Sequence, residues 1–552
     1  MIADIHITEK SFGDKTLMKD VKFSVDDGEK VGVVGRNGVG KSTLFGILSG
    51  KDTDYTGEVI FRRGITVATT AQEHHGLGDQ TVMSYILGGL PEYSKLKKII
   101  DEYPLTMGDN MRKIEEYTQA LERFDQKGFY QVEEKIEREL SNFQLEGFGN
   151  RKISSLSGGQ KRLVEIVKIM HSEAHLALVD EPTNHMDYVA KQQFIDWMNS
   201  QPHQAMLIIT HDRDVLGQVD RIVEIKDGQA VSYRGNYDAY LKQNAQATTA
   251  GMNNFEQIEK RIVNLKQKVL DYQRLKEKSR NPGTIQKFKR LENEARAELE
   301  ELSEMEKPTF WIDKESASQL DYKSAERYGK FKSRNIRLSM KDASSRSQHV
   351  LVRAENVAVG IGERILFEDV NIDLREGEAI EIRGRNGAGK TTLIRMILAS
   401  GKSFDGGPIL YSGDIFLDPQ VRIGVYEQEI DERYLSDPLE KAIEKLYMSR
   451  DLSISDTKIR QLLADYLFTD ADRMTPLARL SGGQKARFQI IAMLANDPQL
   501  LILDEPTNHL DLPSIEELET ALAKYSGAIL YVSHDNYFRE KLGGKVVQIG
   551  VE

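Results

Sequence analysis

With 552 residues, 39% of them hydrophobic, the chain is too long for one ordinary domain and favours two domains joined by a connector. Its formal net charge of −11 argues against general electrostatic affinity for nucleic acid over the whole surface, and the absence of cysteine excludes disulfides and cysteine-held zinc or iron–sulfur centres. No apolar run reaches about 18 residues and the N-terminus lacks the pattern of a secretory signal, so we expect a cytoplasmic protein without a membrane-spanning segment.

Two glycine-rich loops are the first strong signal along the chain. Gly35–Ser42 follows the apolar run Val31–Val34, and Gly384–Thr391 follows Ala379–Ile382. A helical pattern comes after each loop, and the order strand, glycine loop, helix predicts a phosphate-binding P-loop. The loop residues that we expect to contact a nucleotide are Gly35, Asn37, Gly38, Gly40, Lys41, Ser42 and Thr43 in the first copy, and Gly384, Asn386, Gly387, Gly389, Lys390, Thr391 and Thr392 in the second.

The chemistry of these loops follows from the charge of a nucleoside triphosphate. Backbone N–H groups and the positive end of the following helix can hold the phosphates without blocking the γ-phosphorus. Lys41 and Lys390 should reach the β- and γ-phosphates, and the hydroxyl groups of Ser42 and Thr391 should ligate Mg²⁺.

The segment after the first P-loop begins with a strand-like run that ends at Gln72, and Gln428 follows a similar run in the second copy. The amide oxygens of these two residues suit a Mg²⁺ or water ligand.

From about residue 73 to 153 the pattern is mostly helical and predicts a helical subdomain. The alternative is a solvated helical insertion with no function of its own.

Leu156-Ser-Gly-Gly-Gln160 returns as Leu480-Ser-Gly-Gly-Gln484, 324 residues later. The P-loop lysines are 349 residues apart, so the first copy has extra chain between its P-loop and this motif. Serine and two glycines at a helix start form another anion-binding end. The residues of this motif that we expect at a nucleotide are Ser157, Gly158, Gly159 and Gln160, and Ser481, Gly482, Gly483 and Gln484.

The acidic pairs Asp180-Glu181 and Asp504-Glu505 each end an apolar run. The aspartate of each pair can hold Mg²⁺, and the following glutamate can orient a water molecule and accept its proton. His211 and His534 each follow another apolar run, 323 residues apart. A lone histidine at a strand end is usually structural, but the recurrence favours contact with a γ-phosphate.

Residues 246–307 predict two antiparallel helices joined at a tip, with a turn at Asn281–Thr284. The first helix is expected from about Asn254 to Arg280, roughly 40 Å long. Its coiled-coil spacing is carried by Ile258, Ile262, Leu265, Val269 and Tyr272. The segment 308–348 is expected to be an extended strap that leads to the second copy.

Charge is segregated along this predicted hairpin. Lys260–Arg290 contains eleven basic and two acidic residues, whereas Leu291–Glu306 contains seven glutamates and one arginine. A charge run is often a solvated face. At the end of a projecting element in an acidic protein, however, it favours binding to a phosphate backbone by non-specific electrostatics.

The motif order P-loop, glutamine, Leu-Ser-Gly-Gly-Gln, Asp-Glu and histidine, present twice, resembles the ATP-binding cassette superfamily. The resemblance implies an α/β fold with two tandem P-loop ATP-binding cassette domains, 1–245 and 349–552, joined by a long α-helical hairpin linker and strap at 246–348. It also implies an ATPase with ATP and Mg²⁺ as cofactors and two composite sites, each joining the P-loop of one cassette to the Leu-Ser-Gly-Gly-Gln motif of the other. Asn184–Asp187 and Asn508–Asp511 match the loop that communicates between such sites.

Two fused cassettes, no membrane domain and a charged hairpin between them are similar to the ABC-F subfamily. This resemblance implies a monomeric, ribosome-associated ATPase whose ATP-closed form binds near the tRNA exit site. The basic tip Lys260–Arg290 would contact large-subunit RNA and peptidyl-tRNA. A general translation factor and an antibiotic-resistance ribosomal protection protein both stay open. The alternatives are an ATPase subunit that energises a separate membrane transporter and an ATP-gated nucleic-acid tether.

The family places an aromatic residue near the start of each cassette to stack on adenine. Phe12 fits this role in the first copy, but Ile361 stands at the equivalent position of the second. This departure leaves adenine stacking in the second copy open and allows the two sites to differ in affinity.

Overall fold

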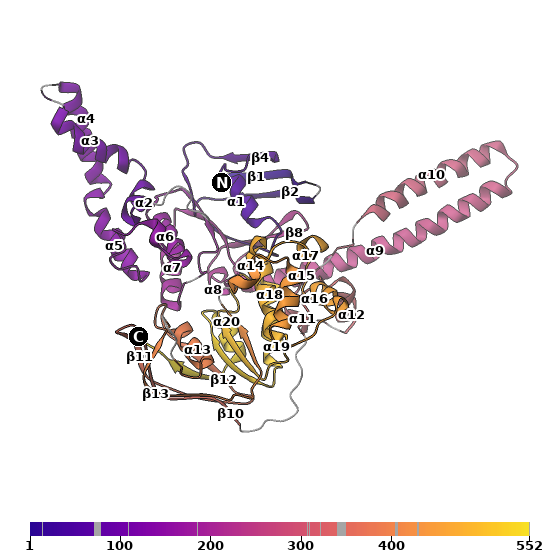
Figure 1. Ribbon diagram of the computed structural model, residues 1–552. Coiled ribbons are helices and arrows are strands. Elements are labelled where there is room, and N and C mark those ends of the chain that lie inside the picture. The colour runs from indigo at the N-terminus through magenta and orange to yellow at the C-terminus, as the bar shows by residue number, and fades with distance from the viewer. Residues whose placement is uncertain are drawn as a thin grey trace. The chain divides into compact units, whose positions relative to one another are not determined.

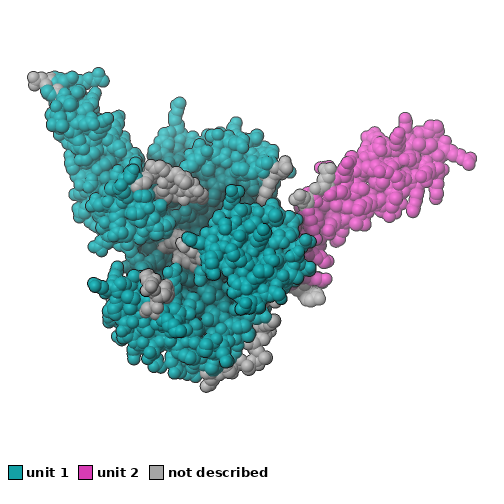
Figure 2. Space-filling model, in the orientation of Figure 1, with its two compact units in different colours: residues 1–237, 336–552 teal, residues 238–335 magenta. Residues whose placement is uncertain are grey.

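The computed structural model describes residues 1–550 except 14, 71–78, 107, 109, 185, 306, 309, 319, 321, 339–348, 403–406 and 428–429. Its residues form two compact units, coloured separately in Figure 2. The first unit comprises Met1–Tyr237 together with Ile336–Glu552, and the second comprises Asp238–Asn335. The first unit contains both copies of the repeated motifs, and the second contains the predicted hairpin.

Each copy is built on a mainly parallel sheet whose strands include the apolar runs before the P-loop and before the acidic pair. The first sheet has the order β5 (Val67–Thr69), β6 (Leu176–Asp180), β7 (Ala205–Ile209), β3 (Lys30–Gly35), β8 (Arg221–Lys226) and β9 (Gln229–Arg234). The second has the order β14 (Ile423–Tyr426), β15 (Leu500–Asp504), β16 (Ala528–Val532), β12 (Ala379–Arg383) and β17 (Lys545–Gln548). Strands β6, β7, β15 and β16 are buried along their whole length, as strands covered on both faces should be.

A three-stranded antiparallel sheet accompanies each parallel sheet. Its strands are β1 (Ala3–Phe12), β2 (Lys15–Val25) and β4 (Thr56–Phe61) in the first copy, and β10 (Val350–Ile361), β11 (Arg364–Arg375) and β13 (Ile409–Leu417) in the second. Phe12 pairs with Lys15 at the end of its hairpin, and Ile361 pairs with Arg364. The two hairpins therefore confirm that Ile361 occupies the place of Phe12.

Helices flank both parallel sheets. In the first copy they are α1 (Lys41–Leu48), α6 (Gly158–His171), α7 (Tyr188–Ser200) and α8 (Arg213–Leu216). In the second they are α13 (Lys390–Leu398), α14 (Glu432–Leu435), α15 (Leu439–Met448), α16 (Asp456–Asp465), α17 (Asp470–Arg473), α18 (Gly482–Leu494), α19 (Leu512–Ala523) and α20 (Asn536–Leu542). Helices α1 and α13 begin at the P-loop lysines, one residue before the starts at Ser42 and Thr391 that the sequence predicts.

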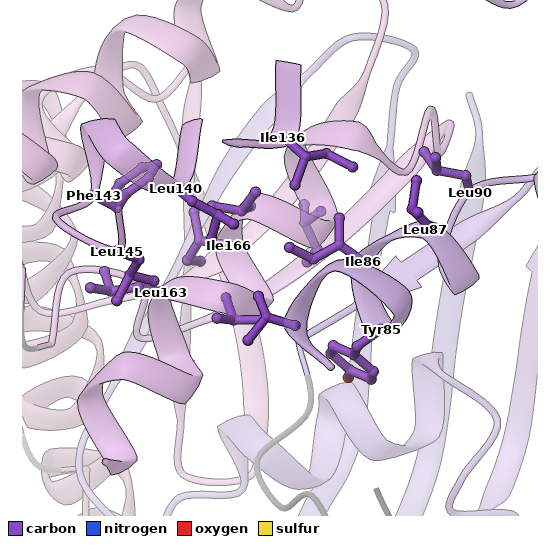
Figure 3. Packing of buried hydrophobic residues seen from close by; sticks show 14 of the residues in the cluster. Tyr85, Ile86, Leu87, Leu90, Ile136, Leu140, Phe143, Leu145, Leu163 and Ile166 are labelled. Atoms are coloured by element: carbon purple, nitrogen blue, oxygen red, sulfur yellow. The ribbon is translucent and has the colours of Figure 1, made fainter. Parts of the chain in front are cut away.

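The insertion predicted at about 73–153 is helical over the part that the structure describes. It contains α2 (Val82–Gly88), α3 (Tyr93–Thr106), α4 (Met111–Gln126) and α5 (Val132–Asn142), and α3 and α4 project as an antiparallel pair (Figure 1). Figure 3 shows how Ile86, Ile136, Leu140, Phe143 and Ile166 pack together, and each is at most 1% exposed. The insertion is therefore anchored on α6, which carries the first Leu-Ser-Gly-Gly-Gln motif.

The second unit contains the predicted antiparallel hairpin, α9 (Tyr237–Lys278) and α10 (Pro282–Glu304), whose two helices lie side by side in Figure 1. Leu265, Val269 and Ala295 are buried between the helices, and the rings of Tyr272 and Phe288 stack with centroids 6.4 Å apart. The side chain of Asn281 caps α10 by accepting hydrogen bonds from the backbone N–H groups at 283 and 284. Among the described residues, no helix is both long and apolar enough to cross a membrane.

Two predictions for this unit are wrong in detail. Helix α9 begins at Tyr237 and not near Asn254, so its 42 residues extend over about 63 Å. The strap also contains two helices, α11 (Lys314–Ser318) and α12 (Tyr322–Phe331), where an extended chain was predicted. The physical reason is a small apolar core, invisible in a local pattern, that packs the start of α9 against the strap; its buried members are Met252, Ile312, Tyr328 and Phe331.

Leu265→Ala should loosen the hairpin, because Leu265 is 2% exposed and its truncation leaves a cavity between α9 and α10. The free energy of local opening should fall by about 2–5 kcal/mol. Amide hydrogen exchange should therefore accelerate in α10 and stay unchanged in the parallel sheets. Val263→Ala, two residues away and 65% exposed, is the matched control. Equal exchange rates in the two variants would contradict the packing seam.

Candidate active site

The two P-loops have the same internal geometry. Lys41 Nζ donates hydrogen bonds to the carbonyl oxygens of Gly35 at 2.6 Å and Arg36 at 3.2 Å. Lys390 Nζ repeats this with the corresponding carbonyls at 2.9 and 3.0 Å. Burial lowers the pKa of both lysines, although nearby carboxylates oppose the shift. Both amines are thus held at the mouth of a loop whose last glycine, Gly40 or Gly389, has a left-handed φ of 106° or 99°.

A hydroxyl and a carboxylate meet beside each P-loop. Ser42 Oγ lies 3.2 Å from Asp180 Oδ2, and Thr391 Oγ1 lies 2.7 Å from Asp504 Oδ2. Oxygen donors of this kind are the ligands that Mg²⁺ prefers, so the residues present fit this ion. The predicted additional ligands, Gln72 and Gln428, lie outside the described residues.

Each site also contains a glutamate and a histidine that are neighbours. Glu181 Oε1 lies 3.5 Å from His211 Nε2, and Glu505 Oε1 lies 3.4 Å from His534 Nε2. Both glutamates have left-handed backbones, with φ of 46° and 52°, because the chain turns sharply at the end of β6 and β15. The structure thus brings each glutamate beside a histidine, and the catalytic roles expected for these residues stay predictions.

Burial dominates the electrostatics of these residues. It raises the pKa of Glu181 to about 8 and that of Glu505 to about 7, although Lys41 and Lys390 oppose the shift. Burial, assisted by the same lysines, lowers the pKa of His211 and His534 to about 3. At neutral pH both histidines are therefore uncharged, and both glutamates sit near the pKa that suits a proton acceptor.

Several polar atoms of these glutamates and histidines are buried without a hydrogen-bond partner among the described residues. They are Nδ1 and Nε2 of His211, Nε2 of His534 and Oε1 of Glu505. A buried polar group without a partner costs about 1–3 kcal/mol, and such groups cluster where a polar ligand completes the site.

The serines of the two Leu-Ser-Gly-Gly-Gln motifs cap helices. Ser157 Oγ accepts a hydrogen bond from the Gln160 backbone N–H at 3.3 Å, and Gln160 Oε1 accepts one from the Ser157 N–H at 3.0 Å. Ser481 and Gln484 repeat the arrangement at the start of α18. Because each pair satisfies its own two N–H groups, the glycine N–H groups at the helix start stay available for an anion.

An aspartate from each copy joins it to the P-loop of the other. Asp187 Oδ1 accepts from the Ala190 N–H and caps α7, while its Oδ2 accepts from the Asn386 N–H at 3.0 Å. Asp511 Oδ1 likewise caps α19, and its Oδ2 accepts from the Asn37 N–H at 3.1 Å. Burial opposes the charge on both carboxylates, but these hydrogen bonds and nearby arginines hold the pKa of each below its ordinary value.

One cavity of about 1030 Å³ lies at this junction and is lined by both copies. Its wall includes these predicted site residues: Ser157, Gly158, Gly159, Gln160, Glu181 and His211 from the first copy, and Asn386, Gly387, Gly389, Lys390, Thr391, Thr392, Asp504, Glu505 and His534 from the second. The second P-loop and the first Leu-Ser-Gly-Gly-Gln motif are thus brought together around one space.

The first P-loop and the second Leu-Ser-Gly-Gly-Gln motif lie in direct contact. A Cβ atom on Gly483 would lie only 2.0 Å from Asn37 Nδ2, so the second Leu-Ser-Gly-Gly-Gln motif abuts the first P-loop. Asn37 Nδ2 also donates a hydrogen bond to the carbonyl oxygen of His509 at 2.9 Å. The first P-loop, Asp180 and the second motif are therefore adjacent but do not line the large cavity.

The expected base-stacking positions differ as the sequence indicates. Phe12 is 56% exposed, and Lys10 Nζ lies 4.7 Å from the centre of its ring. Ile361 lines the cavity together with Arg364 and Leu366, so aliphatic side chains and a guanidinium stand where an aromatic ring was expected.

The resemblance places Asn184–Asp187 and Asn508–Asp511 in a loop that communicates between the sites, but it does not say which groups these residues bind. Sequence reasoning missed Lys191 and Arg213, which also cross between the copies. The signal for the aspartates is their recurrence, Asp187 and Asp511, seven residues after each strand-end aspartate. Lys191 carries no such signal because the second copy does not repeat it.

Comparisons with known proteins agree with this architecture. The family model described as ABC transporter matches residues 18–184 and 367–508. The chain is 30% identical to the putative ATP-binding protein YdiF of Bacillus subtilis (strain 168), covering 100% of this chain and 80% of that protein. It is 29% identical to ABC transporter F family member 2 of Arabidopsis thaliana (98% and 75% covered) and 27% identical to the ribosome protection protein VmlR of Bacillus subtilis (strain 168) (96% and 83% covered).

Among solved structures, the chain resembles the archaeal ribosome recycling factor aABCE1, determined in complex with the archaeal ribosomal stalk protein aP1. The TM-score is 0.58 at 16% sequence identity, and the match covers 99% of this chain and 87% of the other. At this identity the likeness concerns the fold, and it supports tandem cassettes as the architecture of the chain.

Glu505→Gln should remove one pH-dependent contribution to stability. The pKa of Glu505 is about 7 in the folded protein against an ordinary value of 4.5, so folding takes up a proton between these values. The proton bound to Glu505 therefore stabilises the folded protein fully below about pH 4.5, and this stabilisation is lost as the pH rises to about 7. Denaturant unfolding should therefore show the variant gaining stability over wild type across this range and no further above it.

Glu444→Gln, at an exposed position of α15, is the matched control for this measurement. A stability difference between Glu505→Gln and wild type that does not change from pH 4.5 to 7 would contradict the raised pKa.

Proposed function

The chain belongs to the ABC transporter family and, within it, to the ABC-F proteins, and on this premise we propose that it hydrolyses ATP at two composite sites and binds the ribosome in its ATP-closed form. As a family member it is an ABC ATPase. The proposal assigns cassettes to residues 1–245 and 349–552 and the hairpin linker and strap to 246–348.

The reciprocal hydrogen bonds of Asp187 and Asp511 carry the two-site proposal. Because each carboxylate binds the backbone of the opposite P-loop, each P-loop lies at the junction and not on an outer surface. A nucleotide in either P-loop would then meet the serine-capped helix start of the other cassette. In one site this is α18, facing the first P-loop; in the other it is α6, facing the second.

In the first site, Lys41 would turn from the loop carbonyls to the β- and γ-phosphates, and the N–H groups of Gly38, Gly40 and Ser42 would bind the phosphate oxygens. Mg²⁺, held by Ser42 and Asp180, would supply neutralisation of the phosphate charge. Glu181 would accept a proton from the attacking water, and the neutral His211 would donate a hydrogen bond to the γ-phosphate. Lys390, Thr391, Asp504, Glu505 and His534 would take the same roles in the second site.

The surface charge of the hairpin supports the proposed contact with the ribosome. Of the eleven basic residues in Lys260–Arg290, three form ion pairs within the hairpin: Arg261 with Glu298, Lys276 with Glu292 and Arg290 with Glu294. Four further basic residues lie near the turn and form no ion pair with any described residue. They are Lys278, Arg280, Lys287 and Lys289. The end of the hairpin can therefore bind several phosphates of large-subunit RNA or peptidyl-tRNA near the tRNA exit site.

The similarity to these relatives favours the ribosome as the nucleic-acid partner whose phosphate backbone the hairpin binds. One of them is named a ribosome protection protein. We propose the same class of partner here, as a translation factor or as a protein that protects the ribosome against antibiotics.

The variant Glu181→Gln/Glu505→Gln should bind ATP but lose about 10²–10⁴-fold in turnover, because it lacks both proton acceptors. It should therefore co-sediment with ribosomes when ATP is present and stay in the supernatant without nucleotide. Lys41→Ala/Lys390→Ala, which removes the phosphate contacts, is the control that should not bind in either condition. Association independent of ATP, or recovery with membranes, would contradict the proposal.

Reversal of the unpaired tip charges, Lys278→Glu/Arg280→Glu/Lys287→Glu, should weaken ribosome binding and flatten its salt dependence. Each phosphate contact contributes about 0.7–0.9 to the slope of log K against log salt, so the slope should fall by about 2–3. The matched control makes the same charge change at the exposed cassette residues Lys19, Lys22 and Lys524. A slope that changes equally in both variants would remove the tip from the contact.

A further inference from the structure

A buried ionic cluster crosses one half of the junction between the cassettes. Its centre is Lys191 on α7, which is 4% exposed. Lys191 Nζ donates to Asp214 Oδ2 at 2.6 Å within its own cassette, and to the backbone carbonyl oxygen of His534 in the other at 2.8 Å. Asp214 Oδ2 also accepts a hydrogen bond from Asn536 Nδ2 at 2.8 Å.

Arg213 extends this cluster. Its guanidinium donates hydrogen bonds to Glu519, which is 1% exposed, and to Asp535 Oδ2 at 3.3 Å, and it lies 4.8 Å from the ring centre of Tyr537. All three partners belong to the second cassette. Charged hydrogen bonds of this kind are strong where water is excluded, so the cluster ties the residues after His534 to the first cassette.

The corresponding positions on the other half of the junction, all within the described residues, do not carry the side chains of this cluster. The residue offsets that relate the two copies place Ile515 at the position of Lys191, and Asn536 at that of Arg213. They likewise place Tyr537 at the position of Asp214 and Ile195 at that of Glu519. Ile515 has no side-chain donor, so it cannot offer the carbonyl of His211 the hydrogen bond that Lys191 offers His534.

Lys191 also belongs to the surroundings of the second site. It lines the same cavity as Lys390, Glu505 and His534, although it comes from the first cassette. Its hydrogen bond holds the carbonyl group of His534 itself, which is attached to the Cα atom from which the His534 side chain extends. The bond therefore restrains the backbone torsion next to that Cα atom and, with it, the place of the imidazole.

We propose that Lys191 is a positioning residue supplied by the first cassette to the second nucleotide site, and that the first site has no equivalent. The second site is then complete only when the cassettes are docked on this half, whereas the first site does not depend on such a contact. This inference rests on the proposed hydrolysis at two sites.

The test measures ATP hydrolysis in variants in which one site is silenced. In Glu181→Gln only the second site turns over, and adding Lys191→Ile should lower kcat roughly tenfold or more, with KM for ATP changed less than about threefold. In Glu505→Gln only the first site turns over, and the same substitution should change kcat by less than about threefold. Gln192→Ala, an exposed neighbour on α7, is the matched control in both backgrounds.

The comparison of kcat and KM in the two backgrounds separates positioning from general damage. Loss of folded protein would lower the rate in both backgrounds alike, whereas loss of positioning lowers kcat only in the background where the second site turns over. Lys191→Ile/Asp214→Asn, which removes a partner charge together with the lysine, keeps the test valid if the single variant unfolds.

An equal loss of kcat in the two backgrounds, or no loss in either, would overturn the role of Lys191. Absence of turnover already in the parent Glu181→Gln would instead overturn hydrolysis at the second site, and the inference with it. The two failures are thus distinguished by the parent variant alone.

Discussion

The carboxylates of Asp187 and Asp511 hold the central junction of this protein together. Each divides its two oxygens between the first turn of its own helix and a backbone N–H of the opposite P-loop. A buried carboxylate without partners would be strongly unfavourable, but here every hydrogen bond that satisfies it also fixes a structural element. Each aspartate consequently fixes the start of its own helix relative to the P-loop of the other cassette.

Burial sets the electrostatic character of the glutamates and histidines beside the P-loops. It is the main reason for the raised pKa values of Glu181 and Glu505. The same burial keeps His211 and His534 uncharged. The chemistry proposed for the second site draws on both cassettes, because both copies line the cavity that contains its P-loop.

The two halves of the junction are equal in their reciprocal aspartates and unequal elsewhere. One half carries the ionic cluster around Lys191 and Arg213, and the other has Ile515 and Ile195 at the corresponding positions. The positions expected to stack on a base also differ, with Phe12 in one copy and Ile361 beside Arg364 in the other. The P-loop residues are repeated in the two copies while their surroundings differ, so equal motifs do not imply equal sites.

The sequence by itself determined the P-loops, the buried strands, the serine-capped helix starts and the two-helix hairpin, because each depends on local spacing that repeats or alternates. The grouping of Glu181 with His211 and of Glu505 with His534 in one site came from the family resemblance and not from spacing along the chain. Only the tertiary structure decided the true start of α9 at Tyr237, the helices of the strap and the partners of Asp187, Asp511 and Lys191. These features arise from contacts between segments distant in the chain, and a pattern read along the chain contains no information about which distant group completes a buried charge.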